Sequence, residues 1–176
     1  MVRPAAHARS VALEILQQEH INLALEVGVD GHDDLAQALA ARVRASFERQ
    51  GMMQHLDARL LKVEQGLVEL VLPYSDKVTQ QQDGFHGGAM GALADIAGGY
   101  AGLTVAAEGM EVTTAEYKIN FLAAFQAGEL RATGRVLKAG RRLIVTTAEV
   151  VHVAPGGATS PCAVMQQTLV PVPKTY

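Results

Sequence analysis

The stretch Gly84-Phe-His-Gly-Gly-Ala-Met-Gly-Ala-Leu-Ala-Asp-Ile-Ala-Gly-Gly-Tyr-Ala-Gly-Leu-Thr-Val-Ala-Ala107 decides the fold, and Asp95 is its one charged residue. A glycine inside a helix costs about 1 kcal/mol relative to alanine, so this many glycines indicate a helix that packs closely against other backbone. A membrane span of this length would contain more bulky aliphatic residues and no central acid. We therefore expect a small-residue helix wrapped by a sheet.

The spacing within this stretch is informative about a site. We expect His86, Gly87 and Gly88 to form the first helical turn, where unpartnered backbone N–H groups favour negative charge. Asp95 follows His86 by nine residues, which is about 180° around a helix and about 13 Å along it. One helix therefore cannot aim both groups at one small substrate. Two antiparallel copies in a symmetric dimer can, so the spacing predicts a site shared between subunits.

The whole chain has 176 residues, enough for a domain with its own core. With 49% hydrophobic residues, 19% charged residues and a net charge of −3, it is typical of a soluble globular protein and not of a nucleic-acid-binding one. The single cysteine, Cys162, fits a reducing compartment. The first residues lack the continuous apolar region of a signal peptide. We expect a cytoplasmic protein, and we find no spacing typical of metal ligands.

Before the central stretch, the pattern changes from helical to extended. Apolar residues at helical spacing predict helices over 11–27 and 35–50, the second ended by Gly51. Residues 59–64 and 67–72 read as a hairpin, and 73–83 as a polar loop.

After the central stretch, four strands are predicted, over 112–121, 129–138, 143–153 and 162–172. Strict alternation in the first of them places Thr113 and Tyr117 on one face and Thr114 on the other. Short turns between successive strands favour an antiparallel meander. One long helix and about six strands indicate an α+β domain in which the helix lies in a curved sheet.

These features together resemble a known family. The matching segments are Gln80-x5-His86-Gly87-Gly88, Leu93-Ala94-Asp95, Thr114-Ala-Glu-Tyr-Lys-Ile-Asn-Phe121 and Gly134-Arg-Val-Leu-Lys-Ala-Gly-Arg141. They resemble the hotdog-fold acyl-CoA thioesterases, above all the PaaI-like (phenylacetic-acid-degradation type) family, over roughly residues 40–172. Residues 1–38 have no counterpart and are assigned to an N-terminal helical extension, which leaves 39–176 as the hotdog domain.

The resemblance implies a hotdog fold, a curved antiparallel sheet around one long central helix. It implies a homodimer, or a homotetramer of paired dimers, with active sites at the dimer interface, in agreement with the spacing argument. It further implies hydrolysis of an acyl- or arylacyl-CoA to the free acid and coenzyme A. No cofactor is expected, because coenzyme A is part of the substrate.

The resemblance also suggests residue roles. Catalysis is expected from the backbone N–H of Gly87, which polarises the thioester carbonyl, and from Asp95 of the other subunit, as nucleophile or general base. His86 either takes part directly or caps the helix. The expected substrate-binding residues are Gln80, Gly88, Thr114 (with Thr113 as the alternative) and Arg141, whose charge either meets the phosphates of coenzyme A or lies on a solvated turn.

Two other functions fit the same fold. One is a non-catalytic acyl-CoA-binding hotdog protein, and Asp95 argues against it because a lone acid in an apolar helix is costly to bury. The other is a hotdog hydratase or dehydratase, which the His86–Asp95 spacing suits less well.

Overall fold

The structure is a computed structural model that describes residues 33–176. The predicted helix over 11–27 and nearly all of the predicted extension over 1–38 lie outside the described residues. The compact unit that carries the candidate site is Leu39–Tyr176. No helix in the described part of the chain is long and apolar enough to cross a membrane.

The helix predicted over 35–50 ends earlier than predicted. Residues 33–47 are helical, and a turn follows. Gly51, the predicted end of the helix, instead begins a second short helix, α2 (Gly51–His55). The reason is the extended backbone of Gln50 (φ −82°, ψ 99°), which redirects the chain and allows α2 to bury Met53 in the core.

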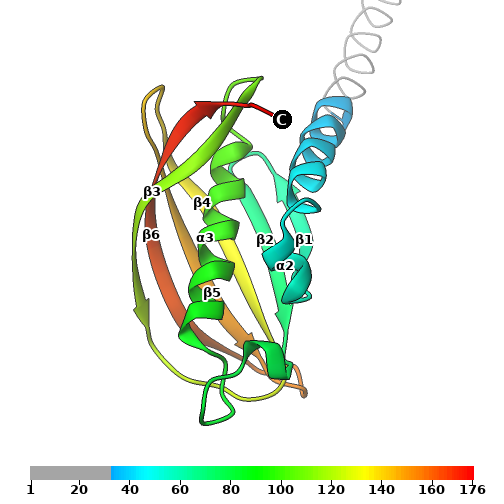
Figure 1. The fold of residues 1–176 in the computed structure, drawn as a ribbon, viewed down its shortest axis with the longest axis vertical. Helices are drawn as coiled ribbons and strands as arrows, with labels where there is room; N and C mark the ends of the chain where they lie inside the picture. The colour runs from blue at the N-terminus through cyan, green and yellow to red at the C-terminus, as the bar shows by residue number, and fades with distance from the viewer. Residues whose placement is uncertain (1–32) are drawn as a thin grey trace, which may run out of the picture. The chain divides into compact units, whose positions relative to one another are not determined.

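Six strands form one antiparallel sheet in the order β1-β2-β4-β5-β6-β3 (Figure 1). Their bounds are β1 (Arg59–Glu64), β2 (Leu67–Pro73), β3 (Met110–Phe121), β4 (Glu129–Ala139), β5 (Ile144–Val153) and β6 (Thr159–Pro173). All six predicted strands are present. The loop expected over 73–83 contains one turn of 3₁₀ helix, η1 (Asp76–Val78).

The strand order corrects the predicted meander. β4, β5 and β6 do follow one another, but β3 does not lie beside β4. The position beside β4 is taken by β2, which pairs Leu70 with Ala132. β3 therefore lies at the other edge of the sheet, where it pairs with β6.

The central helix, α3 (Gly87–Leu103), lies along the inner face of the curved sheet (Figure 1), as predicted. Its close packing has a structural cause in both elements. A Cβ added at Gly134 of β4 would lie 2.1 Å from the carbonyl oxygen of Ala97, and one added at Gly102 would lie 2.3 Å from Leu169 Cδ1. The glycines thus allow the helix backbone to approach the sheet more closely than any side chain would permit.

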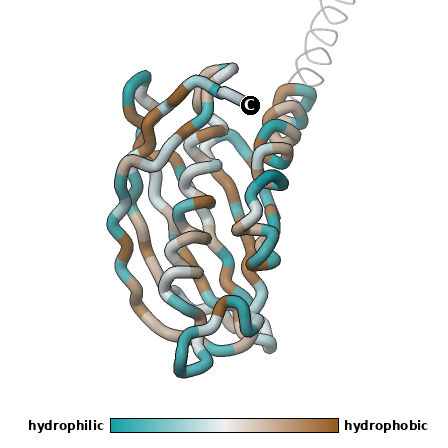
Figure 2. Tube along the Cα trace, viewed as in Figure 1, coloured by the Kyte–Doolittle hydropathy of each residue, from teal (hydrophilic) through white to brown (hydrophobic). Residues whose placement is uncertain are grey.

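The core between helix and sheet is aliphatic. Figure 2 shows apolar residues distributed along the strands around α3. Leu70, Leu93, Leu130 and Leu169 are each no more than 1% exposed. These side chains fix the distance between α3 and the sheet, and so the position of any group that α3 carries.

A β-bulge in β3 overturns the predicted alternation. Thr114 pairs with Leu169 and Glu116 with the adjacent Thr168, so one extra residue, Ala115, lies between them. A bulge of this kind reverses the faces beyond it. Thr114 and Tyr117 therefore both face α3: Thr114 hydrogen-bonds Asp95 at 2.7 Å, and the Tyr117 hydroxyl is 3.7 Å from a Cβ added at Gly91.

Candidate active site

The start of α3 is capped by His86. Its backbone is extended (φ −68°, ψ 135°), and its Nδ1 accepts a 2.8 Å hydrogen bond from the N–H of Gly88. His86 is therefore the residue before the helix and not part of the first turn. Of the two roles considered for it, capping is the one present in the structure. The Gly88 N–H is occupied by this bond, so it can bind a substrate only if the cap opens.

Gly87 is the first residue of α3. Within residues 33–176, no group accepts a hydrogen bond from its N–H. The ring of Phe121, which is 52% exposed, lies 3.4 Å from a Cβ added at Gly87. The helix start thus presents one free backbone donor beside an exposed aromatic ring.

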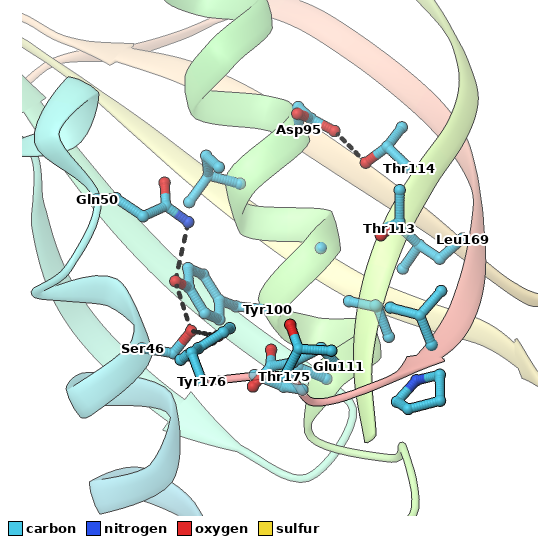
Figure 3. A pocket seen from close by; sticks show the side chains of 16 residues that line it. Ser46, Gln50, Asp95, Tyr100, Glu111, Thr113, Thr114, Leu169, Thr175 and Tyr176 are labelled. Carbon is cyan, nitrogen blue, oxygen red and sulfur yellow. Dashed lines mark hydrogen bonds between the residues drawn. The ribbon is translucent and has the colours of Figure 1, made fainter. Parts of the chain in front are cut away.

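Asp95 lies half-buried in the middle of α3, facing β3 and β6. Thr114 Oγ1 donates a 2.7 Å hydrogen bond to its Oδ1 (Figure 3), and Gln167 Nε2 donates to the same oxygen. Burial raises the pKa of the Asp95 carboxyl above its usual range, and the hydrogen bonds from Thr114 and Gln167 lower it by a smaller amount. The structure thus brings Thr114, and not the alternative Thr113, into contact with the carboxylate.

Gln167 is a residue that the sequence analysis missed. It lies on β6, is 1% exposed, and accepts a 3.0 Å hydrogen bond from Thr146 Oγ1 of β5. A signal was present in the sequence: the inward positions of this strand are otherwise apolar, as at Met165 and Leu169. One amide in such a series has to be hydrogen-bonded to something buried.

A cavity of about 310 Å³ opens beside Asp95, between α3, β3 and the C-terminal residues (Figure 3). Its walls near Asp95 include Ile96, Gly99, Leu103 and Val112. The opposite end is polar: Gln50 donates to the Tyr100 hydroxyl at 2.9 Å, which in turn donates to Ser46 at 3.2 Å. The cavity therefore has a mixed lining, apolar in part and polar in part, with the Asp95 carboxylate on its wall.

Gln80 and Arg141 lie away from Asp95 within one chain. Gln80 is in the loop that leads into α3, where its side chain accepts a hydrogen bond from the Gln82 N–H. It therefore belongs to the Gly87 end of the helix. Arg141 is exposed in the turn between β4 and β5, and nothing in the structure brings it near either group.

The predicted site residues thus form two groups on one helix. Gly87 and His86 lie at the start of α3, and Asp95 lies in its middle with Thr114. Gly87 and Asp95 are eight residues apart, about 12 Å along the helix. A single chain does not bring the free amide and the carboxylate to one small substrate.

The described residues contain neither a metal-ligand cluster nor an ionised thiol. In residues 33–176, no cluster of three His, Cys, Asp or Glu side chains could hold a metal ion. Cys162 is buried and donates to the Val150 carbonyl at 3.2 Å. Its burial raises the pKa of the thiol to about 11, so Cys162 packs as a protonated side chain and is not a nucleophile near neutral pH.

A six-stranded antiparallel sheet curved around one long helix, with a carboxylate in mid-helix, defines a hotdog-fold protein. Comparison with known proteins specifies the family. Residues 84–157 match the thioesterase superfamily. A putative esterase of Saccharolobus solfataricus is 35% identical over 98 residues, which cover 56% of this chain and 69% of the relative. The chain belongs to the thioesterase superfamily.

Solved structures agree with this assignment. A thioesterase family protein from Silicibacter pomeroyi is 35% identical, with a TM-score of 0.75, and the match covers 77% of this chain and 99% of that one. The PaaI protein of the Escherichia coli phenylacetic acid degradation operon superposes with a TM-score of 0.71 at 21% identity, over 80% of this chain and 98% of that one. The second similarity is one of fold.

Proposed function

We propose that this protein hydrolyses acyl-CoA thioesters to a free acid and coenzyme A. Its membership of the thioesterase superfamily makes it a thioester hydrolase. The observation that carries the proposal is Asp95: a half-buried carboxylate with one oxygen held by Thr114 and Gln167, at the mouth of a cavity of about 310 Å³. A fixed carboxylate beside an acyl-sized cavity suits attack on a carbonyl at that position.

In the proposed reaction the thioester carbonyl lies beside Asp95. The ionised carboxylate either attacks the carbonyl carbon or removes a proton from a water that attacks it. The carbonyl oxygen gains negative charge, which the Gly87 N–H of the partner subunit stabilises. The C–S bond then breaks, and coenzyme A leaves as a thiolate that takes up a proton. On the route by direct attack, this leaves a mixed anhydride between the acyl group and Asp95, which a water molecule hydrolyses to the free acid and the regenerated carboxylate. One preorganised donor of this kind is worth about 2.7–4 kcal/mol in the transition state.

The proposal requires a homodimer, and the edge of the sheet supports one. Among the described residues, β3 has a neighbouring strand on one side only. This twelve-residue edge carries exposed Tyr117 and Phe121. A long edge strand with apolar side chains is a template for pairing with another chain. A tetramer of such dimers is compatible with the same interface.

Pairing of β3 with its copy would complete the site. Phe121 lies against Gly87, and Thr114 hydrogen-bonds Asp95. Antiparallel pairing about a two-fold axis near Lys118, midway between Thr114 and Phe121, places the Phe121 end of one strand opposite the Thr114 end of the other. The amide of one subunit then faces the carboxylate of its partner.

The remaining predicted contacts concern the substrate. We place the acyl group in the cavity beside Asp95. We place Gln80 and the Gly88 region near the thioester carbonyl. Arg141 is placed near the phosphates of coenzyme A. The cavity volume of about 310 Å³ and the apolar part of its lining suit aryl-acetyl to medium-chain acyl groups. We further propose that the enzyme acts in the cytoplasm and needs no cofactor beyond the coenzyme A of its substrate.

The test is hydrolysis of phenylacetyl-, benzoyl-, hexanoyl- and decanoyl-CoA, followed by release of free thiol. The natural sequence is expected to hydrolyse at least one of them. Asp95→Asn is expected to fold and to lose roughly 10²–10⁴ in rate, as for removal of a general base. If neither protein hydrolyses any thioester while acyl-CoA raises the melting temperature of both, the protein is an acyl-CoA-binding module and the proposal is wrong.

A further inference from the structure

Behind Asp95, the inner face of the sheet contains a buried polar pair. Thr146 of β5 and Gln167 of β6 are paired neighbours in the sheet and are 0% and 1% exposed. Burying a hydroxyl and an amide is unfavourable unless every polar atom finds a partner. These two residues partner each other and Asp95, so their presence in an aliphatic core is linked to that carboxylate.

The donor and acceptor atoms of Gln167 can be assigned from the groups that they meet. A carboxylate can only accept, so the Gln167 amide must turn its Nε2 toward Asp95. There the two hydrogens of Nε2 are shared among three acceptors: Asp95 Oδ1, the Asp95 carbonyl oxygen at 3.2 Å and Thr114 Oγ1 at 2.9 Å. The Gln167 Oε1 then accepts from Thr146 at 3.0 Å. The carboxylate thus decides which end of the amide faces it, and Thr146 holds the other end by donating to Oε1.

The helix leaves room for this pair at Gly98. A Cβ added there would lie 2.3 Å from Gln167 Oε1 and 2.9 Å from Thr146 Oγ1. Gly98 follows Asp95 by three residues, so both lie on the same face of α3. The glycine therefore makes space for the amide that contacts Asp95.

We propose that Gln167 is a positioning residue for the reaction: with Thr114 it holds Oδ1 of Asp95 and leaves Oδ2 as the oxygen that attacks or accepts the proton. No described residue donates a hydrogen bond to Oδ2. Thr146 supports the role by fixing the Gln167 amide. This inference rests on the proposed function, because it assigns the reacting oxygen of that site.

The test is the pH dependence of kcat/KM for Gln167→Met, measured with the best thioester of the panel. Methionine keeps the volume and removes the donor that stabilises the ionised carboxylate. We expect kcat/KM to fall about 10-fold or more and the acidic limb of the profile to move up by about one pH unit. The other ionisable groups lining the cavity are Tyr100, Glu111 and Tyr176. Burial raises the pKa of Asp95, and Thr114 and Gln167 are the side chains whose hydrogen bonds lower it.

Two glycine variants separate positioning from general damage to the core. Gly98→Ala pushes a Cβ into Gln167, whereas Gly102→Ala, one turn along the helix, pushes one into Leu169 at the same 2.3 Å. Both should lower the melting temperature. Only Gly98→Ala should also move the acidic limb of the kcat/KM profile to higher pH. If Gln167→Met does not fold, Thr146→Val and Gly98→Ala decide the question, since each displaces or frees the same amide.

A second readout does not need activity. The pKa of Asp95 is measured from the ¹³C carboxyl resonances of the labelled protein, assigned by comparison with Asp95→Asn. If the natural protein hydrolyses nothing but Gln167→Met still raises this pKa, the positioning contact is right and the proposed function is wrong. If Gln167→Met and Gly98→Ala leave both the limb and the pKa unmoved, Gln167 is structural and the inference is overturned.

Discussion

Gly87 contributes its backbone N–H to the proposed site, and an ordinary side-chain substitution does not remove this group. Gly87→Pro can, because it removes the N–H. Proline is favoured at the first position of a helix, and His86 before it already has the extended backbone that proline requires (φ −68°, ψ 135°). We expect kcat to fall about 10²–10³-fold, while circular dichroism shows an unchanged fold.

Gly87→Ala is the matched control for this prediction. It keeps the N–H and adds a Cβ in ordinary contact with Phe121, at 3.4 Å. Its rate should stay within a few-fold of the natural protein in the same thiol-release assay. Equal losses in both variants would mean that crowding against Phe121, and not the missing amide, reduces the rate.

We expect Asp95 to lower the stability of the folded protein at pH values above the acidic range. Because burial raises the pKa of its carboxyl above 3.8, the native state binds this proton more tightly than the unfolded chain does. The contribution of Asp95 to stability is therefore lost as the pH rises from 3.8 through the raised native pKa. Asp95→Asn has no charge to bury, so we expect it to melt at a higher temperature at neutral pH.

The measurement is the melting temperature of both proteins at a series of pH values. The difference should shrink as the pH falls toward 3.8, the value in the unfolded chain. A difference that stays constant across the series would mean that the charge of Asp95 is not its source. Such a result would also weaken the case for a strained, functional carboxylate.

At the same residue scale, the relation between two site residues could be predicted when they are close in sequence and could not when they are far apart. Gly87 and Asp95 lie in one helix, so helical geometry is enough to give their separation. Gln167 is 72 residues from Asp95 in sequence. Alternation places Gln167 on the inner face, but only the strand order and the position of α3 over the sheet decide that it meets Asp95.

At the scale of elements, the contact between α3 and β4 sets how deep the helix lies. A Cβ at Gly134 would meet the backbone of Ala97 at 2.1 Å, and backbone cannot rotate away. We expect Gly134→Ala to lower the free energy of unfolding by about 1–3 kcal/mol or more, as overpacking does. Thermal and denaturant unfolding measure this change.

Gly99 provides the comparison within the same helix. A Cβ added there meets nothing within 4 Å, so Gly99→Ala should stabilise the helix by up to about 1 kcal/mol. If Gly134→Ala lowers the free energy of unfolding and Gly99→Ala raises it, close packing is the reason that position 134 is a glycine. If Gly134→Ala were neutral, the helix would be able to lift from β4, and the position of Asp95 would not depend on this contact.

The elements themselves were largely predictable, whereas their pairing was not. The glycine-rich apolar stretch predicted α3, and residue patterns with their turns predicted all six strands, because each signal lies in one continuous segment of the chain. The bulge at Ala115 and the position of β3 beside β6 depend on a partner strand far along the chain. The same limit explains why alternation placed Thr114 and Tyr117 on opposite faces of β3, although both face α3.

At the scale of the whole molecule, the proposed function depends on a second copy of the chain. The carboxylate and the free amide of one subunit are about 12 Å apart along α3, too far to act on one carbonyl. The number of residues between Gly87 and Asp95 is sufficient to predict this separation. Two subunits related by a two-fold axis contain two complete sites, each with Asp95 from one chain and Gly87 from the other.

Heterodimers of two inactive variants test this arrangement directly. Asp95→Asn and Gly87→Pro subunits, co-expressed with different tags and purified through both, contain one site with both defects and one intact site. We expect about half of the activity of the natural dimer, although each variant alone is nearly inactive in thiol release. If each site lay within a single chain, both sites of the heterodimer would carry one defect. The mixed dimer would then be as inactive as its parents, and the shared site would have to be abandoned.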